Sequence, residues 1–454
     1  MLRIAYALLL ASVFVLRGQD GALNNALDER ISSALRASGA PSVSVAVVQH
    51  GEITYAKAFG QADIAENRSA DAATRYAVGS VSKQFTAAAL LLLAEQGKIS
   101  LDDKVGKYFP DLTRAREVTI RELLSHTSGY EDYAPQDYII PEWTHPITPG
   151  EILNQWAKKP LNFDPGTRWQ YSNTNYVIAG QIFEKVSGQP LMAFLREKIF
   201  QPLGMSTPGE ITDHAPADAS AYTRYALGPP RVVAREGPGW MFAAGELAMT
   251  PSDLARWDIA FLDKKILSAR SYSDFTSEVK LKNHKETHYA LGLSLGELNG
   301  TPMISHTGEV SGFLTSNAVF PAKGVAVVVC SNEDGIGLVG PLGRQIAGLA
   351  LGGASEKEIG QVRGILEGLR EGRVDRSIFT SDANSYFNDV VVKDFAASLG
   401  GLGKLLDVTK TNEQLRGGMT HRSYRAQYEK KTVLLNVYVM PDGRYEQFLV
   451  EETL

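Results

Sequence analysis

Valine-rich β segments stand at both ends of a stretch whose other patterns are helical. Residues 42–60 alternate apolar and small side chains around a His50-Gly51 turn, as a β-hairpin does. Two more strands are predicted much later, at 313–320 and 325–331. Helical periodicity dominates the residues between, in particular 84–96, 118–124, 176–186 and 251–262. We therefore expect an α+β fold in which one antiparallel sheet, built from both ends of the domain, is flanked by helices.

A second, smaller domain is predicted after this one. A chain of 454 residues is longer than one hydrophobic core usually serves. A predicted helix at 340–351 ends in the small residues Gly352-Gly353-Ala354-Ser355, which mark a boundary. Helices are then predicted at 359–370, 383–387 and 390–399, and strands at 419–428, 432–440 and 445–450. We expect residues 23–352 to form the main domain and 356–454 a small α+β accessory domain of unknown role.

The first 22 residues have the pattern of an export signal. Arg3 supplies a positive end, and residues 4–16 are mostly apolar. Such a stretch is short for a bilayer span, which needs about 20 residues, but it suits a signal peptide. We expect a secreted or periplasmic protein. An uncleaved N-terminal anchor is the alternative, because Arg17 follows at once without a small-x-small cleavage site.

Composition excludes several classes of function. The apolar fraction of 44% and the charged fraction of 21% are those of a globular protein, and the net charge of −5 provides no basic field for nucleic acid. The one cysteine, Cys330, lies in an apolar run that predicts a buried strand thiol, so no disulfide within the chain is expected. The eight histidines lack metal-ligand spacing, and we predict neither a metal nor a cofactor.

The sequence Ser80-Val81-Ser82-Lys83 opens an apolar helix. Side chains three apart on a helix share a face, so the hydroxyl of Ser80 and the amine of Lys83 can meet. A serine needs a base to become a nucleophile, and a buried lysine can be that base if its pKa is lowered. The spacing alone is weak, since Ser277-Glu278-Val279-Lys280 repeats it.

Two further polar motifs follow. Tyr171-Ser172-Asn173 is predicted on a turn before a helix that begins near Tyr176. There a phenol beside a cationic lysine would lose its proton more easily, and an amide could hold a substrate carbonyl. The third motif, His306-Thr307-Gly308, precedes the predicted strand at Phe313 and could bind an extended substrate along a strand edge. Taken singly, each is more often a structural turn.

Together and in this order, the motifs resemble the group of class C β-lactamases, D-alanyl-D-alanine carboxypeptidases, D-aminopeptidases and related esterases. The resemblance covers roughly residues 25 to 350. Four further blocks carry it: Leu123-Leu124-Ser125-His126-Thr127-Ser128-Gly129, Phe163-Asp164-Pro165-Gly166, Pro202-Leu203-Gly204-Met205 and Thr250-Pro251-Ser252-Asp253-Leu254-Ala255.

The resemblance implies a sheet flanked by helices, an all-helical lobe and a site between them. Ser80 would be acylated, with Lys83 and Tyr171 sharing proton transfer. Asn173, His306, Thr307 and Gly308 would bind the substrate, and the backbone N–H groups of Ser80 and Glu309 would form the oxyanion hole. His126 would lie in a structural loop near the site, outside the catalytic set.

The third motif departs from the group's usual Lys-Thr-Gly, in which lysine attracts a substrate carboxylate. Here the residue is His306, which is largely uncharged at neutral pH. We therefore expect a serine hydrolase acting on an ester or on a D-amino-acid-containing amide or peptide. The alternatives are a true β-lactamase or penicillin-binding D,D-peptidase, and, in another class, a ligand-sensing protein that signals through residues 356–454.

Overall fold

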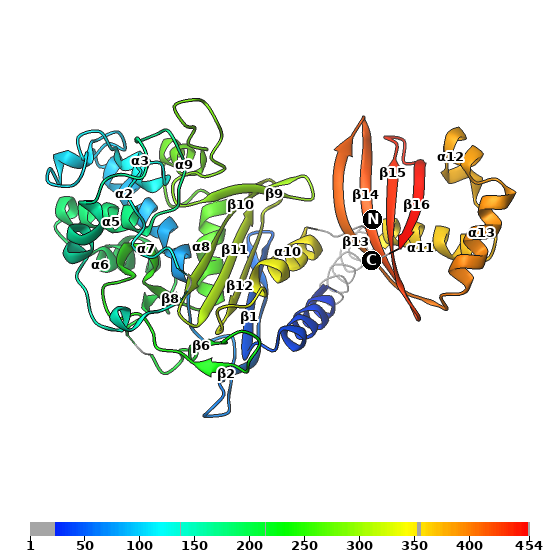
Figure 1. Ribbon diagram of the computed structural model, residues 1–454, viewed down its shortest axis with the longest axis horizontal. Coiled ribbons are helices and arrows are strands. Elements are labelled where there is room, and N and C mark those ends of the chain that lie inside the picture. The colour runs from blue at the N-terminus through cyan, green and yellow to red at the C-terminus, as the bar shows by residue number, and fades with distance from the viewer. Residues whose placement is uncertain (1–22, 137, 214, 352–355, 453–454) are drawn as a thin grey trace, which may run out of the picture. The chain divides into compact units, whose positions relative to one another are not determined.

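The computed structural model describes residues 23–136, 138–213, 215–351 and 356–452 (Figure 1). The predicted signal segment, residues 1–22, lies outside the described residues. The chain divides into two compact units, one of Met1–Gly296 with Pro302–Ala350 and one of Leu351–Leu454 with the hairpin tip Glu297–Thr301. Within the described part, no helix has the length and apolar content that crossing a bilayer requires.

A seven-stranded sheet organises the first unit. Its strand order is β3-β2-β1-β12-β11-β10-β9, and the pairings β1–β2, β1–β12, β11–β12 and β10–β11 are all antiparallel. Val45 in β1 is opposite Val329 in β12, so the two ends of the unit meet at the sheet centre. The predicted antiparallel sheet is therefore correct. The strands are β1 Ser42–Gln49, β2 Glu52–Asp63, β3 Arg68–Ser69, β9 Ser294–Leu298, β10 Thr301–Val310, β11 Phe313–Phe320 and β12 Val325–Ser331.

Helices cover this sheet and build a lobe beside it (Figure 1). The first seven residues of β1 are all buried; helix α8 packs on β1 and β12, and helix α10 packs on β11 and β12. Because neighbouring side chains of a strand point to opposite faces, β1 is covered on both. The helices are α2 Lys83–Glu95, α3 Ile120–Leu124, α4 Pro149–Ile152, α5 Asn173–Ser187, α6 Leu191–Leu195, α7 Phe242–Gly245, α8 Pro251–Leu262, α9 Ala269–Thr276 and α10 Val339–Ala350.

Short strands join the lobe to the nucleophile segment. A three-stranded sheet has the order β4-β8-β5, in which Ala77 of β4 pairs with Ala248 of β8. Strand β4 ends just before Ser80. Its pairing with β8 therefore holds the chain in place at the start of the nucleophile turn. The short strands are β4 Tyr76–Ala77, β5 Gly209–Glu210, β6 Tyr222–Thr223, β7 Arg231–Val232 and β8 Leu247–Met249.

The second unit contains helices followed by an antiparallel sheet of order β13-β14-β15-β16. Three strands were predicted, and the fourth, β13 Leu405–Arg416, was missed. It is an edge strand with mostly exposed polar residues, so it lacks the apolar alternation that identifies a strand. The other elements are α11 Glu356–Arg370, α12 Ser381–Tyr386, α13 Asp389–Gly400, β14 Met419–Tyr428, β15 Thr432–Val439 and β16 Tyr445–Glu452.

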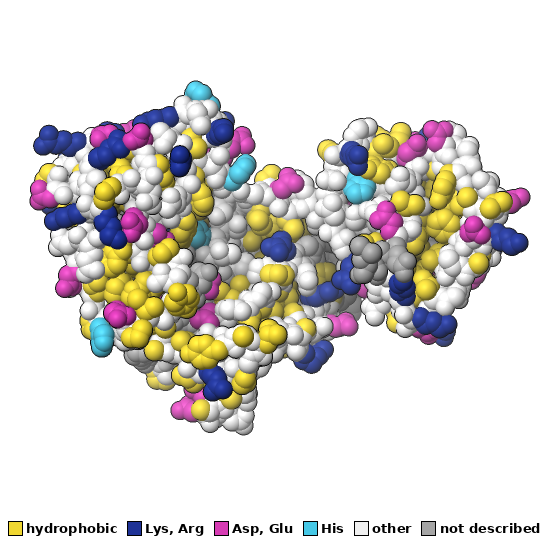
Figure 2. Space-filling view, in the orientation of Figure 1, with side chains coloured by type: hydrophobic (Ala, Val, Ile, Leu, Met, Phe, Trp, Pro, Cys, Tyr) yellow, Lys and Arg dark blue, Asp and Glu magenta, His cyan; other side chains and the backbone are white. Residues whose placement is uncertain are grey.

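Charged side chains of both signs are interspersed over the face of the molecule seen in Figure 2. No large field of one sign covers this view, in keeping with the net charge of −5. The chemistry of the chain must therefore be sought in a local site.

Candidate active site

Ser80 lies at a change of helix type. Residues Gly79–Ser82 form a 3-10 turn that runs directly into α2. Gly79 has a φ of +51°, which glycine adopts without the strain that a side chain would add. The tight turn leaves Ser80 partly exposed, while Lys83, one turn later, is fully buried. The Lys83 Nζ lies 2.8 Å from the Ser80 Oγ, as the spacing predicted.

The amine of Lys83 also contacts two acceptors from distant parts of the chain. Its Nζ donates to the Oδ1 of Asn173 and to the carbonyl oxygen of Ala244, each at 2.8 Å. Burial lowers the pKa of Lys83 to about 7, although the charge of Asp132 opposes the shift. A neutral amine has two N–H donors and one lone pair. The two acceptors can take the donors, which leaves the lone pair for the proton of the Ser80 hydroxyl.

Tyr171 and Asn173 lie at the start of α5. This helix begins at Asn173, earlier than the predicted Tyr176, because its polar first turn hides the apolar periodicity. The Tyr171 side chain hydrogen-bonds with that of Ser80, and the Lys83 Nζ lies 4.9 Å from the centre of the Tyr171 ring. The second motif is thus brought to the nucleophile.

The expected acidity of the phenol is wrong. Burial raises the pKa of Tyr171 well above its usual value, and the hydrogen bond from Ser80 only partly offsets this effect. Removing the phenol from water therefore outweighs any stabilisation of phenolate by neighbouring groups. At neutral pH Tyr171 keeps its proton, so it is suited to donate one rather than to accept one.

The third motif lies inside strand β10, which pairs with the strand at Phe313, so it occupies a strand as its functional interpretation expected and not a structural turn. His306 is buried. Its Nδ1 lies 2.5 Å from the carbonyl oxygen of Thr307, and its Nε2 lies 2.8 Å from the Tyr289 hydroxyl. A carbonyl only accepts, so Nδ1 carries the proton and Nε2 accepts from the phenol of Tyr289. Burial and the nearby Lys83 lower the pKa of His306 to about 4, which keeps the ring neutral.

Strand β10 passes very close to the nucleophile turn. A Cβ atom at Gly308 would lie 1.9 Å from the carbonyl oxygen of Val78 and 3.2 Å from the amide nitrogen of Ser80. A Cβ at Gly79 would lie 2.7 Å from the amide nitrogen of Glu309. The amide groups of Ser80 and Glu309 are therefore neighbours, as an oxyanion hole requires. The Thr307 side chain is exposed next to them.

Asp132 is a site residue that the sequence did not identify. Its Oδ1 accepts from the backbone N–H of Asn173 at 2.9 Å, and its Oδ2 accepts from the Asn173 Nδ2 at 3.3 Å. The amide of Asn173 is thus oriented, with its oxygen toward Lys83. Burial raises the pKa of Asp132 above its usual value, and Lys83 opposes the rise. No spacing in the sequence links Asp132 to Asn173, which follows it by 41 residues.

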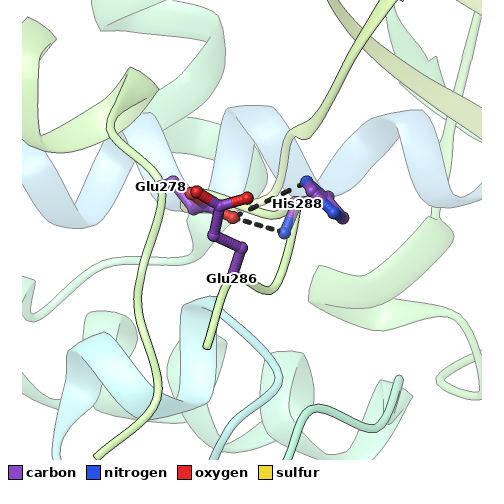
Figure 3. Close-up of side chains that lie close together, drawn as sticks. All are labelled: Glu278, Glu286 and His288. Atoms are coloured by element: carbon purple, nitrogen blue, oxygen red, sulfur yellow. Dashed lines mark hydrogen bonds and ion pairs between the residues drawn. The ribbon is translucent and has the colours of Figure 1, made fainter. Parts of the chain in front are cut away.

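One group of side chains in the described residues could hold a metal ion. Glu278, Glu286 and His288 each offer a ligand atom within 4.8 Å of the others (Figure 3). The Glu278 Oε1 already accepts the backbone N–H of His288 at 2.7 Å, and Glu286 and His288 are exposed. Glu278, Glu286 and His288 do not stand in the spacing of a helical metal motif, so the sequence pattern does not indicate this group. The Ser80 hydroxyl already has a base in the amine of Lys83, 2.8 Å away.

A cavity of about 310 Å³ lies behind the catalytic helix. Ser82 and Thr86 of α2 line it, together with three carboxyl groups, those of Glu184, Glu210 and Glu246. Burial and the neighbouring carboxyl groups raise the pKa of Glu246 to about 8. The wall of this cavity thus carries an acid that is mainly protonated at neutral pH.

The comparison with known proteins covers nearly the same residues as the resemblance that the motifs indicated. The family model described as Beta-lactamase matches residues 27–350. Penicillin-binding protein 4* of Bacillus subtilis is 30% identical over an alignment that covers 64% of this chain and 68% of that protein. The D-aminopeptidase of Brucella anthropi is 28% identical, with coverage of 67% of this chain and 61% of the relative, so the chain spans less than two thirds of that enzyme.

Solved structures agree on the fold. A D-stereospecific amidohydrolase from a Streptomyces species has a TM-score of 0.61 at 27% identity, covering 69% of this chain and 95% of that one. A D-amino acid amidase from Ochrobactrum anthropi SV3, complexed with D-phenylalanine, has a TM-score of 0.62 at 26% identity, covering 69% and 92%. An octameric penicillin-binding protein homologue from Pyrococcus abyssi has a TM-score of 0.65 at 21% identity, covering 94% and 99%.

Proposed function

The chain belongs to the Beta-lactamase family of serine hydrolases, and we propose that it hydrolyses amides or esters of D-amino acids through an acyl-enzyme on Ser80. One observation carries the proposal: a buried amine with a pKa of about 7 lies 2.8 Å from a partly exposed serine hydroxyl. A general base works best when its pKa is near the working pH.

Acylation uses the groups in a defined order. The neutral amine of Lys83 takes the proton of Ser80 as the Oγ attacks the substrate carbonyl. The backbone N–H groups of Ser80 and Glu309 stabilise the oxyanion that forms. The protonated phenol of Tyr171 gives its proton to the leaving nitrogen or oxygen, and the ammonium of Lys83 restores it. A water molecule then attacks the ester on Ser80 with the proton transfers reversed, which regenerates the hydroxyl and releases the acid.

The neutral state of His306 favours a substrate whose leaving group carries no carboxylate. The ring is neutral and both of its nitrogens are engaged, with Thr307 and with Tyr289. It therefore offers neither charge nor a spare donor to a carboxylate. A simple amide or ester leaving group does not need either one. The carboxylate of a β-lactam or of a terminal D-alanine would lose its usual electrostatic partner.

The position of Asp132 favours a substrate with a free amino group on its acyl part. If Asn173 holds the substrate amide, the carboxyl group of Asp132 lies directly beside the bound acyl group. A carboxylate there attracts the free ammonium of an amino-acid amide, because opposite charges interact more strongly away from bulk water. The D-aminopeptidase and the D-amino acid amidase that this chain resembles are named for the same substrate class.

Penicillin recognition is the second candidate function. It is favoured by the similarity to penicillin-binding protein 4*, the relative that is 30% identical to this chain. The two candidates differ in outcome: a β-lactamase turns a chromogenic cephalosporin over, and a penicillin-binding peptidase keeps a stable penicilloyl group on Ser80. We also propose, from the N-terminal pattern, that the substrate is met in the periplasm or outside the cell.

The test compares Ser80→Ala with the unchanged protein on D- and L-amino-acid p-nitroanilides, a short-chain p-nitrophenyl ester and a chromogenic cephalosporin. Ser277→Ala is the matched control, since Ser277 is exposed and stands in the same Ser-x-x-Lys spacing. We expect turnover of the D-anilide and of the ester, lost in Ser80→Ala and kept in Ser277→Ala. Intact mass should show an acyl group on the unchanged protein and on Ser277→Ala, and none on Ser80→Ala. Turnover that survives Ser80→Ala would refute the proposal.

A further inference from the structure

We propose that His126 is a positioning residue that holds Tyr171 in place for proton transfer to the leaving group. The inference rests on the proposed function, because it assigns His126 to the proton donor of that mechanism. Nothing in the mechanism above uses the imidazole itself. Its contacts, however, converge on Tyr171 and its two chain neighbours.

His126 contacts three consecutive residues, Gln170, Tyr171 and Ser172, of which the last two open the second motif. Its carbonyl oxygen accepts the backbone N–H of Gln170 at 3.0 Å, and its Nδ1 accepts the backbone N–H of Ser172 at 3.2 Å. Its ring lies against the ring of Tyr171, with centroids 4.2 Å apart and planes inclined by 35°. The backbone on both sides of Tyr171 and the Tyr171 ring are therefore fixed by one residue, with the imidazole contacting the ring and Ser172 and the backbone carbonyl contacting Gln170.

Tyr171 is thereby held between two groups. The imidazole of His126 contacts its ring, and the Nζ of Lys83 lies 4.9 Å from the centre of the same ring. The phenol end reaches Ser80. Because general acid catalysis needs its proton within hydrogen-bond reach of the leaving atom, a small rotation of this ring would separate donor from acceptor.

The imidazole is itself confined. His126 is fully buried, and the ring centroids of Tyr176 and Tyr289 lie 5.4 Å and 5.0 Å from its own. Its Nδ1 accepts backbone and amide protons, the second from the Asn175 Nδ2 at 3.4 Å, so the proton of the neutral ring resides on Nε2. Burial lowers the pKa of His126 well below its usual value. The ring is therefore a fixed neutral support and not a proton acceptor.

The residue is not placed there for stability. His126 has a φ of +60°, a left-handed conformation that costs energy for a side chain of this size. Its Nε2 is buried and has no hydrogen-bond partner within the described residues. Strain and an unpaired buried donor both oppose folding. Local features of this kind persist at functional sites, which fits a role in orienting Tyr171.

The test compares two replacements that both tolerate the left-handed backbone. His126→Asn keeps an acceptor for the Ser172 N–H, and His126→Gly removes both the acceptor and the ring. Each variant is measured on a D-amino-acid amide, which needs a protonated leaving group, and on a p-nitrophenyl ester, which does not. We expect kcat on the amide to fall about 100-fold in His126→Gly, the low end of general acid catalysis, and less in His126→Asn. The KM values and kcat on the ester should change little.

Tyr171→Phe provides the matched comparison. It should show the same selective loss on the amide, and the double variant Tyr171→Phe/His126→Gly should lose no more than Tyr171→Phe alone, because the two residues act on one step. Equal losses on amide and ester, or additive losses in the double variant, would overturn the inference. If His126→Gly does not fold in a thermal melt, the amide-to-ester ratio of His126→Asn decides. Absence of an acyl group on Ser80 in the unchanged protein would instead refute the proposed function.

Discussion

Gly308 lies against the carbonyl oxygen of Val78, so close that a Cβ atom at residue 308 would sit 1.9 Å from it. No side chain fits at this distance, and the obstacle is backbone, which cannot turn aside. The contact sets how near strand β10 approaches Ser80. It thereby fixes the separation between the two amide groups assigned to the oxyanion.

Gly308→Ala should therefore abolish most of the turnover. The added methyl group would push β10 away from the nucleophile turn, and loss of one oxyanion donor costs about 100- to 1,000-fold in kcat. Steady-state kinetics on a p-nitrophenyl ester would measure this effect. Gly348→Ala is the control, since no atom lies within 4 Å of a Cβ there. A Gly308→Ala enzyme with normal kcat would mean that β10 does not supply a donor.

The pH dependence of kcat/KM should report Lys83. The free enzyme is active when the amine is neutral, so activity falls as pH drops below the pKa of about 7, tenfold per unit. His306, with a pKa of about 4, and Tyr171, with its raised pKa, do not titrate between pH 5 and 9. On an uncharged ester we expect one apparent pKa near 7 and a plateau above it. A bell-shaped profile centred near pH 7 would contradict this assignment.

Asp132→Asn should move the acid limb to lower pH. The negative charge of Asp132 raises the pKa of Lys83 against the effect of burial, so removing it lets the lysine pKa fall below about 7. Activity at pH 6 relative to pH 8 should then increase. An ester without an amino group isolates this effect from substrate recognition. Asp111→Asn, which changes an exposed carboxyl group, should leave the profile in place.

Glu246→Gln should flatten the pH dependence of stability. The pKa of Glu246 is about 8 in the folded protein and 4.5 without the fold, so the folded state binds the extra proton between these values. Its contribution to stability is full below pH 4.5 and is lost as the pH rises toward 8. The melting temperature of the variant should thus decline less between pH 5 and 8. Glu52→Gln, on the exposed end of β2, should follow the unchanged protein.

The parts of the site that depend on local geometry could be predicted from the sequence. Ser80 and Lys83 are one helical turn apart, and that spacing alone brings oxygen and nitrogen together. The sheet could be predicted because β1, β11 and β12 are rich in apolar residues with high β propensity. The proximity of Ser80 to Tyr171 and His306 was predicted from the family resemblance alone, because no periodicity in the sequence links these residues.

The remaining features depend on contacts between distant residues. The acceptor from Ala244 is a backbone carbonyl, which any residue could provide. Asp132 and His126 reach the site only through the tertiary fold, and neither stands in a recognisable sequence spacing with Tyr171. The raised pKa of Tyr171 arises from burial, so a sequence that shows the neighbouring lysine but not the burial predicts the wrong direction.

Pairing β1 with β12 also has a consequence for how the chain is made. Val43 to Val48 emerge from synthesis early, but their partners Ala326 to Ser331 come about 280 residues later. Contacts of such long range form slowly, because a large loop must close, at a cost in chain entropy, before the contacts can stabilise the fold. Strand β1 can pair with β2 at once, but its other edge stays unpaired in the growing polypeptide until β12 has been added. An interruption of translation before Ser331 would yield an aggregating fragment rather than a weakened enzyme.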